Sequence, residues 1–233
     1  MKLILSCEHG GNKVPEKYQY VFEQHTPILN SHRGYDLGAL DVFNALKPLS
    51  KASFFSEESR LLIERNRSLH HKNLFSEFSK EFSLEEKEAL IKSYKTYRNS
   101  VETAIRILVA KKELVVHISV HSFTPILNTE ERNCDIGLLY DSRNRQEKEF
   151  SYLLKKEILT LNAAINVRYN YPYLGKADGF TSYLRKQFPE NYIGIEIEVN
   201  QKFSKENKIA LFLKELINKG LGNALGMYER RFL

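Results

Sequence analysis

Cysteine is scarce in this sequence, and long apolar runs are missing from it. The chain has only two cysteines among its 233 residues, Cys7 and Cys134, so it cannot form a disulfide scaffold, and their spacing excludes a CxxC site. No apolar run approaches the roughly 20 residues that a helix needs to cross a bilayer. There is also no internal repeat, low-complexity tract or Pro/Gly-rich linker. We therefore expect a soluble protein with no membrane association, folded as a single domain over residues 1–233.

The residues that are abundant predict a globular core. Hydrophobic residues make up 42% of the chain and include 14 Phe and 13 Tyr, far too many for a disordered protein. A chain of this length can bury a sizeable core without external staples. The N-terminal sequence MKLILSC has an apolar stretch of only about five residues, against roughly 7–15 in a signal peptide. We interpret it as a first β-strand and expect a cytoplasmic protein.

The charge balance is positive but diffuse. The net charge is +6 at pH 7 and the pI is about 9.1, with the basic residues scattered along the chain. No recognition-helix, zinc-finger or RNA-recognition signature accompanies them, so we expect a solvated charged surface and no nucleic-acid partner. A mild positive field would favour a small anionic substrate.

Short apolar runs alternate with longer segments of helical periodicity. The expected strands are residues 2–7, 52–55, 60–63, 113–120, 135–140, 165–169 and 192–199. The expected helices are residues 35–46, 84–109, 145–161, 181–186 and 204–228. Ser83 and Glu86 form a capping box at the start of the second of these helices. This order predicts an α/β fold in which a mixed, mostly parallel sheet is covered by helices on both faces.

Sheets of this kind bind ligands beyond the carboxyl ends of their strands, so the residues there are the candidates for function. These positions hold Glu8-His9-Gly10-Gly11-Asn12, Arg65-Asn66-Arg67, His121-Ser122-Phe123, and Glu198 with Asn200 and Gln201. Four expected strand ends therefore carry a metal-ligand side chain, a carboxylate or a guanidinium.

Two histidines are candidate metal ligands. His9 precedes a Gly-Gly pair, which lets the backbone approach a ligand closely, and imidazole is the commonest protein metal ligand. Alternation along the apolar run that ends at His121 puts His117 and His121 on one strand face. We expect His117, in mid-strand, to be a core histidine and His121, the outermost, to be a ligand. Asp36 is either a carboxylate at a helix N-terminus or the third ligand of a two-His, one-carboxylate zinc site, and spacing does not decide.

Charged residues at two other strand ends suggest catalytic chemistry. Glu196 and Glu198 share a face of the last expected strand, and a buried carboxylate needs a partner. We expect Glu198 to be a general base and Glu196 a structural ion-pair member. Arg60, Arg65 and Arg67 form a cluster that could hold a carboxylate or an oxyanion, or could be exposed strand-end arginines. His70 and His71 are expected on the surface.

Taken in order, these pieces resemble the N-formylglutamate amidohydrolase family. The matching pieces are Glu8-His9-Gly10-Gly11, Tyr35-Asp36-Leu37-Gly38-Ala39, Ser59-Arg60-Leu61 with Asn66-Arg67, Ser119-Val120-His121-Ser122-Phe123, Asp178-Gly179 and Glu198-Val199-Asn200-Gln201. They extend over most of the chain. The family in turn looks like a branch of the zinc carboxypeptidase-like (phosphorylase/hydrolase-like) fold.

The resemblance implies hydrolysis of the amide bond of an N-formyl or N-acyl amino acid through a zinc-activated water. One Zn²⁺ would be held by His9, Asp36 and His121. The carboxypeptidase-type motif has a glutamate where this chain has Asn12, so the third ligand comes from elsewhere, with Glu8 as the alternative to Asp36.

The resemblance also implies roles for the remaining candidates. Glu198 would act as general base and Arg60 would stabilise the oxyanion. The implied substrate-binding residues are Asn66, Arg67, Tyr173, Asp178 and Gln201. The alternatives are a peptidase or amidase acting on another N-acyl or cell-wall peptide substrate, and a non-catalytic small-molecule-binding protein on the same fold.

Overall fold

A six-stranded sheet forms the centre of the computed structural model, which describes residues 1–231. The strand order is β2-β1-β3-β8-β6-β7, and all neighbouring pairs are parallel except the antiparallel pair β6 and β8. The strands are β1 (Lys2–Cys7), β2 (Ala52–Phe55), β3 (Val115–Phe123), β6 (Ile136–Leu139), β7 (Val167–Tyr169) and β8 (Tyr192–Asn200). The predicted α/β fold with a mixed, mostly parallel sheet is thus confirmed.

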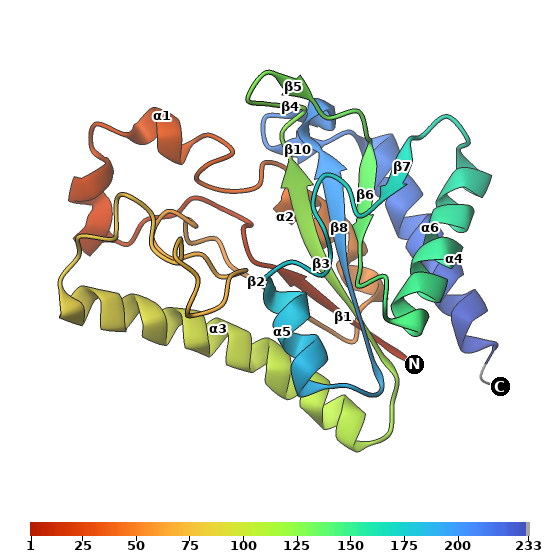
Figure 1. Cartoon of the computed structure of the whole chain (residues 1–233). Coiled ribbons are helices and arrows are strands. Elements are labelled where there is room, and N and C mark those ends of the chain that lie inside the picture. The colour runs from red at the N-terminus through yellow and green to blue at the C-terminus, as the bar shows by residue number, and fades with distance from the viewer. Residues whose placement is uncertain (232–233) are drawn as a thin grey trace.

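Helices cover both faces of this sheet (Figure 1). One face packs against α2 (Ala39–Leu46), α4 (Arg145–Leu161) and α6 (Leu211–Glu229). The other face packs against α3 (Leu84–Ala110) and α5 (Phe180–Gln187). The predicted capping box opens α3, since the Ser83 side chain accepts from the Glu86 N–H and the Glu86 side chain accepts from the Ser83 N–H.

Alternation along the strands divides apolar from polar side chains. In β3, Val116, Ile118 and Val120 enter the core beneath α2, α4 and α6. The residues between them are polar and face the α3 and α5 side, and β8 repeats the pattern with Glu196 and Glu198. Polar groups of the central strands are therefore gathered on one face of the sheet.

The segment between β2 and α3 contains no sheet strand, and the predicted strand at residues 60–63 is wrong. These residues form turns, with the Leu62 N–H donating to the Ser59 carbonyl. Their apolar side chains are buried in a separate cluster that includes Tyr18 and, from α3, Leu90 and Tyr94. The apolar residues 61–63 are thus buried against helices and not in the sheet. The 3-10 helix η1 (Glu16–Phe22) contributes to this cluster, and α1 (Thr26–Leu29) lies nearby; neither was predicted (Figure 1).

Other predicted boundaries are wrong where a turn residue intervenes. The predicted helix at residues 35–46 begins only at Ala39, because Gly38 at φ 79° occupies its N-cap. The predicted helix at residues 204–228 begins at Leu211, because β9 (Ser204–Lys205) and β10 (Lys208–Ile209) form a hairpin first. β3 continues beyond the predicted end at residue 120 to Phe123. The remaining short elements are η2 (Lys47–Leu49), β4 (Ile126–Leu127), β5 (Glu130–Glu131) and η3 (Gln201–Phe203).

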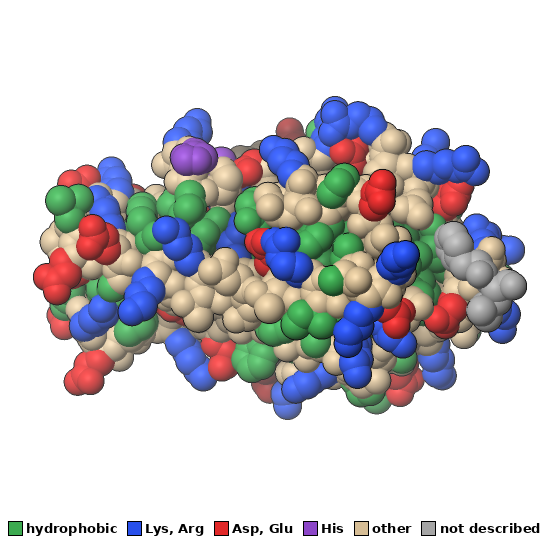
Figure 2. All heavy atoms as spheres, turned by 90° about the horizontal axis from the view of Figure 1, so that it is seen from below, with side chains coloured by type: hydrophobic (Ala, Val, Ile, Leu, Met, Phe, Trp, Pro, Cys, Tyr) green, Lys and Arg blue, Asp and Glu red, His purple; other side chains and the backbone are tan. Residues whose placement is uncertain are grey.

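Charged side chains of both signs are mixed on the surface. Figure 2 shows Lys and Arg side chains interspersed with Asp and Glu on the face seen from below, with no large area of one sign. Among residues 1–231, no helix has the length and apolarity required to span a bilayer.

His117 is a buried core histidine, as predicted. Its Nε2 lies 2.8 Å from the Ser6 hydroxyl oxygen and its Nδ1 lies 2.8 Å from the Tyr192 hydroxyl oxygen. Burial lowers the pKa of this ring to about 4. The neutral ring therefore contributes stability that is present above the unfolded pKa of about 6.5 and is lost as pH falls through 4.

We expect replacement of His117 by Gln to change the pH dependence of folding. The difference in unfolding free energy between wild type and His117→Gln should shrink by about 3 kcal/mol between pH 7 and pH 4, since each pKa unit corresponds to about 1.4 kcal/mol. Urea unfolding at a series of pH values measures this difference. Parallel pH profiles for the two proteins would contradict the assignment.

Candidate metal centre

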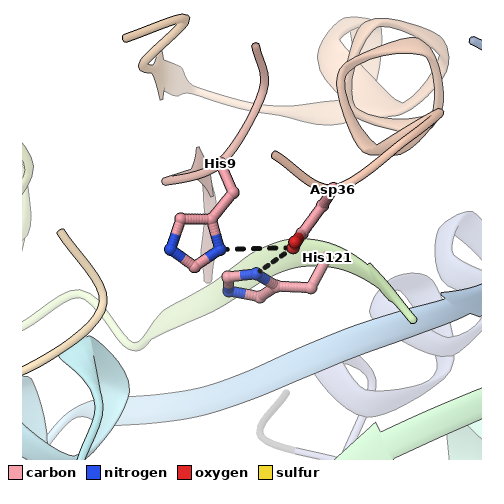
Figure 3. A group of neighbouring side chains, drawn as sticks. All are labelled: His9, Asp36 and His121. Atoms are coloured by element: carbon pink, nitrogen blue, oxygen red, sulfur yellow. Dashed lines mark hydrogen bonds and ion pairs between the residues drawn. The ribbon is translucent and has the colours of Figure 1, made fainter. Parts of the chain in front are cut away.

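The three residues predicted as metal ligands, His9, Asp36 and His121, converge in the structure. The Asp36 Oδ2 atom lies 3.2 Å from His9 Nδ1 and 2.9 Å from His121 Nδ1 (Figure 3). The side-chain ligand atoms all lie within 4.8 Å of one another, and the three residues are only 2–4% exposed. Two imidazole nitrogens and a carboxylate oxygen form the donor set typical of catalytic zinc, so these residues could hold a divalent metal.

Each of these three side chains reaches this point from a different segment. His9 follows β1 and begins the Gly-Gly turn, in which a Cβ on Gly11 would lie 2.8 Å from the Glu57 carbonyl oxygen. Only glycine allows that close approach of the two backbones. The Asp36 N–H donates to the His9 carbonyl over 3.0 Å, so the loop before α2 is attached directly to the backbone of His9. Asp36 lies three residues before Ala39, the first residue of α2, so it is not in the first turn of that helix.

The outer nitrogen of each imidazole meets a second carboxylate. His9 Nε2 contacts Glu64, and His121 Nε2 lies 3.2 Å from Glu8 Oε2 and 2.9 Å from the Ser119 hydroxyl. Both rings thus direct Nδ1 toward Asp36 and Nε2 toward a buried acid. Carboxylates behind ligating histidines fix the ring orientation in metal sites. This places Glu8 behind His121 and leaves Asp36 as the carboxylate that faces both rings.

The carboxylates of the centre are held in their charged forms. Although burial alone would raise it, the pKa of Asp36 lies well below its usual range because His9, His121 and Arg60 surround it. The pKa of Glu64 is likewise lowered, chiefly by Arg60 and His9 against the effect of burial. Arg60 donates from Nη1 to Asp36 Oδ1 over 3.0 Å and from Nε to Glu64 Oε2 over 2.8 Å. This arginine links two acids of the centre.

Glu198 differs from these acids. It lies opposite His121 in the β3–β8 register, it is 4% exposed, and its Oε2 has no hydrogen-bond partner among residues 1–231. Burial raises its pKa to about 8, and the nearby charges of Asp36 and Glu196 act in the same direction against that of His121. Such a carboxyl group is neutral at pH 7 until a cation approaches it. Glu196, expected in an ion pair, instead accepts a hydrogen bond of 2.6 Å from the Thr181 hydroxyl.

The segment 65–67 is held near the centre by several contacts. Asn66 Nδ2 lies 3.5 Å from His121 Nε2, and its Oδ1 accepts from the Phe180 N–H at the start of α5. Arg67 donates to the Asp178 carbonyl over 2.6 Å. Arg65 is buried and pairs with Glu58, so the alternative of an exposed arginine is wrong for this residue.

An open cleft of about 240 Å³ adjoins the centre. It is lined by His32, Arg33, Asp36, Arg60, Ser122, Phe123, Thr124, Leu127, Arg132, Tyr173 and Gln201. Tyr173 and Gln201, two of the predicted substrate-binding residues, therefore lie on the cleft. Asn66, Arg67 and Asp178 lie outside its lining.

Glu64, Arg33 and Arg132 were missed by the sequence reasoning. Glu64 directly follows the predicted strand at residues 60–63, which the structure does not contain, and its carboxylate is not among the predicted site residues. The acid directly before Arg65-Asn66-Arg67 was the available signal. Arg132 follows a short hairpin whose position depends on tertiary contacts, and no sequence pattern indicated it.

Comparison with known proteins places these residues in context. The family model described as N-formylglutamate amidohydrolase matches residues 1–204. None of the curated proteins matches the chain. A solved gene product of Agrobacterium tumefaciens is 24% identical, with a TM-score of 0.81 over 98% of this chain and 92% of that one. The N-formylglutamate amidohydrolase of Ralstonia eutropha is 15% identical, with a TM-score of 0.73 over 100% of this chain and 95% of that one. At these identities the two structures show a shared fold.

Proposed function

The chain belongs to the N-formylglutamate amidohydrolase family, and we propose that it cleaves the amide bond of an N-formyl or N-acyl amino acid with the aid of a bound zinc ion. Membership of the family makes it an amidohydrolase. The observation that carries the finer proposal is the convergence of His9, Asp36 and His121 at a cleft beside the buried Glu198.

His9, Asp36 and His121 are the proposed zinc ligands. Their two imidazole nitrogens and one carboxylate leave a fourth tetrahedral position for water or substrate. A Zn²⁺ ion bound there would polarise the amide carbonyl and lower the pKa of a water to about 7. Glu64 and Glu8 would hold the two rings in orientation from behind.

Glu198 is the proposed general base. It would take a proton from the attacking water and return it to the nitrogen of the leaving amine, so that one carboxyl group serves both steps. Its burial makes the charged form costly, which strengthens it as a base. Nearby positive charge would lower its pKa from about 8 toward the working pH, where proton transfer in both directions is efficient.

Arg60 is the proposed stabiliser of the tetrahedral oxyanion. Its side chain is 28% exposed, it lines the cleft, and its guanidinium is aligned by Asp36 and Glu64. A preorganised donor of this kind stabilises negative charge as it develops. Asn66 and Arg67 are proposed to bind the α-carboxylate, supported by the family pattern and by the position of Asn66 beside His121. Asp178 would fix Arg67 through its carbonyl, while Tyr173 and Gln201 line the cleft.

A substrate panel tests the proposed function. Zinc-loaded protein should hydrolyse N-formyl amino acids or N-acetyl amino acids far faster than peptide-linked ones. The appearance of the free amine measures the rate. The control is Glu198→Gln protein with the same zinc content, which excludes a contaminating hydrolase. Preference for a peptide substrate would favour the peptidase alternative, and binding without turnover of any of them would contradict the proposal.

Glu8 gives a separate test of the metal centre. It accepts hydrogen bonds from the Ser119 hydroxyl at 2.5 Å and the Tyr97 hydroxyl at 3.0 Å, so its carboxylate is fixed behind His121. We expect Glu8→Gln to weaken zinc binding about 10- to 100-fold, the usual effect of losing such a partner. Competition with a chromophoric chelator measures it, with the exposed Glu190→Gln as control. Unchanged affinity in folded Glu8→Gln protein would contradict this role.

A further inference from the structure

Arg98 is a buried cation that has no part in the chemistry described above. It lies in the middle of α3, it is only 5% exposed, and within residues 1–231 its side chain makes no ion pair. A buried charge without an ionic partner is costly, so other contacts have to replace the water that it loses. The residues that supply those contacts indicate what this arginine does.

The guanidinium of Arg98 lies among three aromatic rings. The ring centres of Phe180, Tyr183 and Tyr94 lie 4.2, 4.7 and 4.9 Å from its central carbon. Aromatic faces attract a cation, most strongly where water is excluded. Tyr94 belongs to the preceding turn of α3, whereas Phe180 and Tyr183 belong to α5, so the cation joins these two helices (Figure 1).

The hydrogen bonds of Arg98 go to the backbone around Asn66. Its Nη1 donates to the Arg65 carbonyl over 3.1 Å and to the Arg67 carbonyl over 3.0 Å. The Tyr94 hydroxyl also donates to the Arg67 carbonyl, over 2.7 Å. A single nitrogen atom thus holds the carbonyl groups on either side of Asn66.

The start of α5 links the same arginine to the Asn66 side chain. The Phe180 N–H donates to Asn66 Oδ1 over 2.8 Å, and the Phe180 ring lies against the Arg98 guanidinium. Asn66 Nδ2 in turn lies 3.5 Å from His121 Nε2. Arg98 therefore holds both the backbone of Asn66 and the residue that binds its side chain, so a shift of the guanidinium would move Asn66 relative to His121.

We propose that Arg98 is a positioning residue that holds Asn66 and Arg67 in the place from which they bind the substrate carboxylate. Arg98 is not in the lining of the cleft, so it acts through these two residues without touching the substrate. A planar guanidinium suits this role because it can stack on rings and donate in its own plane at the same time, which a lysine ammonium cannot do. This inference rests on the proposed function, in which Asn66 and Arg67 bind the α-carboxylate.

Kinetics on a substrate with and without its α-carboxylate test this role. In zinc-loaded Arg98→Met protein, KM for N-formyl-L-glutamate should rise by about 10-fold or more, while kcat changes by less than about 3-fold, the pattern of a lost binding contact. The kcat/KM for N-formyl-L-isoglutamine, the α-amide of the same compound, should stay near the wild-type value. The zinc content should also equal that of wild type. Equal losses on acid and amide, a loss confined to kcat, or no loss would overturn the positioning role.

Two further variants separate positioning from a general loss of stability. Arg106→Met is the matched control, because Arg106 is also in α3 and stacks on a ring, that of Phe188, but pairs with Glu102. It should keep the wild-type KM for both compounds. Arg98→Lys can still donate to a carbonyl, so its rise in KM should be smaller than that of Arg98→Met and again confined to the acid. This variant carries the test if Arg98→Met does not fold.

A binding measurement separates this inference from the proposed function. Calorimetric titration of zinc-loaded wild type should show about 10-fold or tighter binding of L-glutamate than of its α-amide, L-isoglutamine, and Arg98→Met should bind both with similar affinity. This result without turnover of either formyl compound would support the positioning role and count against the proposed hydrolysis. Turnover with unchanged discrimination in Arg98→Met would support the hydrolysis and overturn the positioning role. Wild-type protein that binds neither compound, or both equally, would overturn it as well.

Discussion

Replacement of Glu198 by Gln should lower kcat by about 10²- to 10⁴-fold while the metal content stays at the wild-type level. The amide has nearly the same size and shape as the carboxyl group, but it cannot accept a proton from water. The Glu198 carboxyl is not part of the group that converges on Asp36, so the substitution leaves all three proposed ligands in place. Steady-state kinetics on an N-formyl amino acid, with metal quantification of the same sample, measures both quantities.

Glu196→Gln is the matched control for this result. Glu196 lies on the same strand and the same face, two residues earlier, and accepts its hydrogen bond from Thr181. Its replacement should lower kcat by less than about 10-fold, since it is assigned no proton to transfer. A Glu198→Gln protein with near wild-type kcat would remove Glu198 from the role of base. Equal losses in the two variants would indicate a general effect of removing charge from β8.

Replacement of His121 by Ala should remove the metal and the activity together. Two proposed ligands remain in this variant, His9 and Asp36, fewer than the three that catalytic zinc sites use, so we expect the ion to be lost on gel filtration. The loss of activity should exceed that of Glu198→Gln, because polarisation of the carbonyl and activation of the water are lost at once. Metal quantification after gel filtration, together with kinetics, measures the effect.

The matched control for His121→Ala is His117→Gln. His117 belongs to the same strand and face but pairs with Ser6 and Tyr192, away from Asp36. This variant should keep its metal. Stoichiometric zinc in folded His121→Ala protein would exclude His121 as a ligand, and loss of zinc from His117→Gln would point to a general disturbance of β3.

The central strands and the proposed ligands near their ends were predictable because both depend on a local period. Alternation in residues 115–123 and 192–200 separates apolar from polar side chains, and the carboxyl ends of parallel strands meet at one edge of a sheet. His9 and His121 could therefore be paired although they are distant in the sequence. The role of His117 as a core residue followed from its position in mid-strand.

The connecting segments were not predictable in the same way. Residues 61–63 are as apolar as a strand, but they are buried against η1 and α3, and this choice depends on packing partners elsewhere in the chain. Glu64 and Arg132 acquire their positions from such packing, through contacts with His9 and with Asn200. The predicted starts of α2 and α6 were wrong for a related reason. Gly38 and the β9–β10 hairpin interrupt what is a continuous helical pattern in the sequence.

The most direct test of the account is an anomalous-difference map from a crystal of the zinc-loaded protein, measured above and below the zinc absorption edge. The account predicts one strong peak within about 2.0–2.2 Å of His9 Nδ1, His121 Nδ1 and an Asp36 carboxylate oxygen. Zinc bound elsewhere, or coordinated by only one of the two imidazoles, would contradict it.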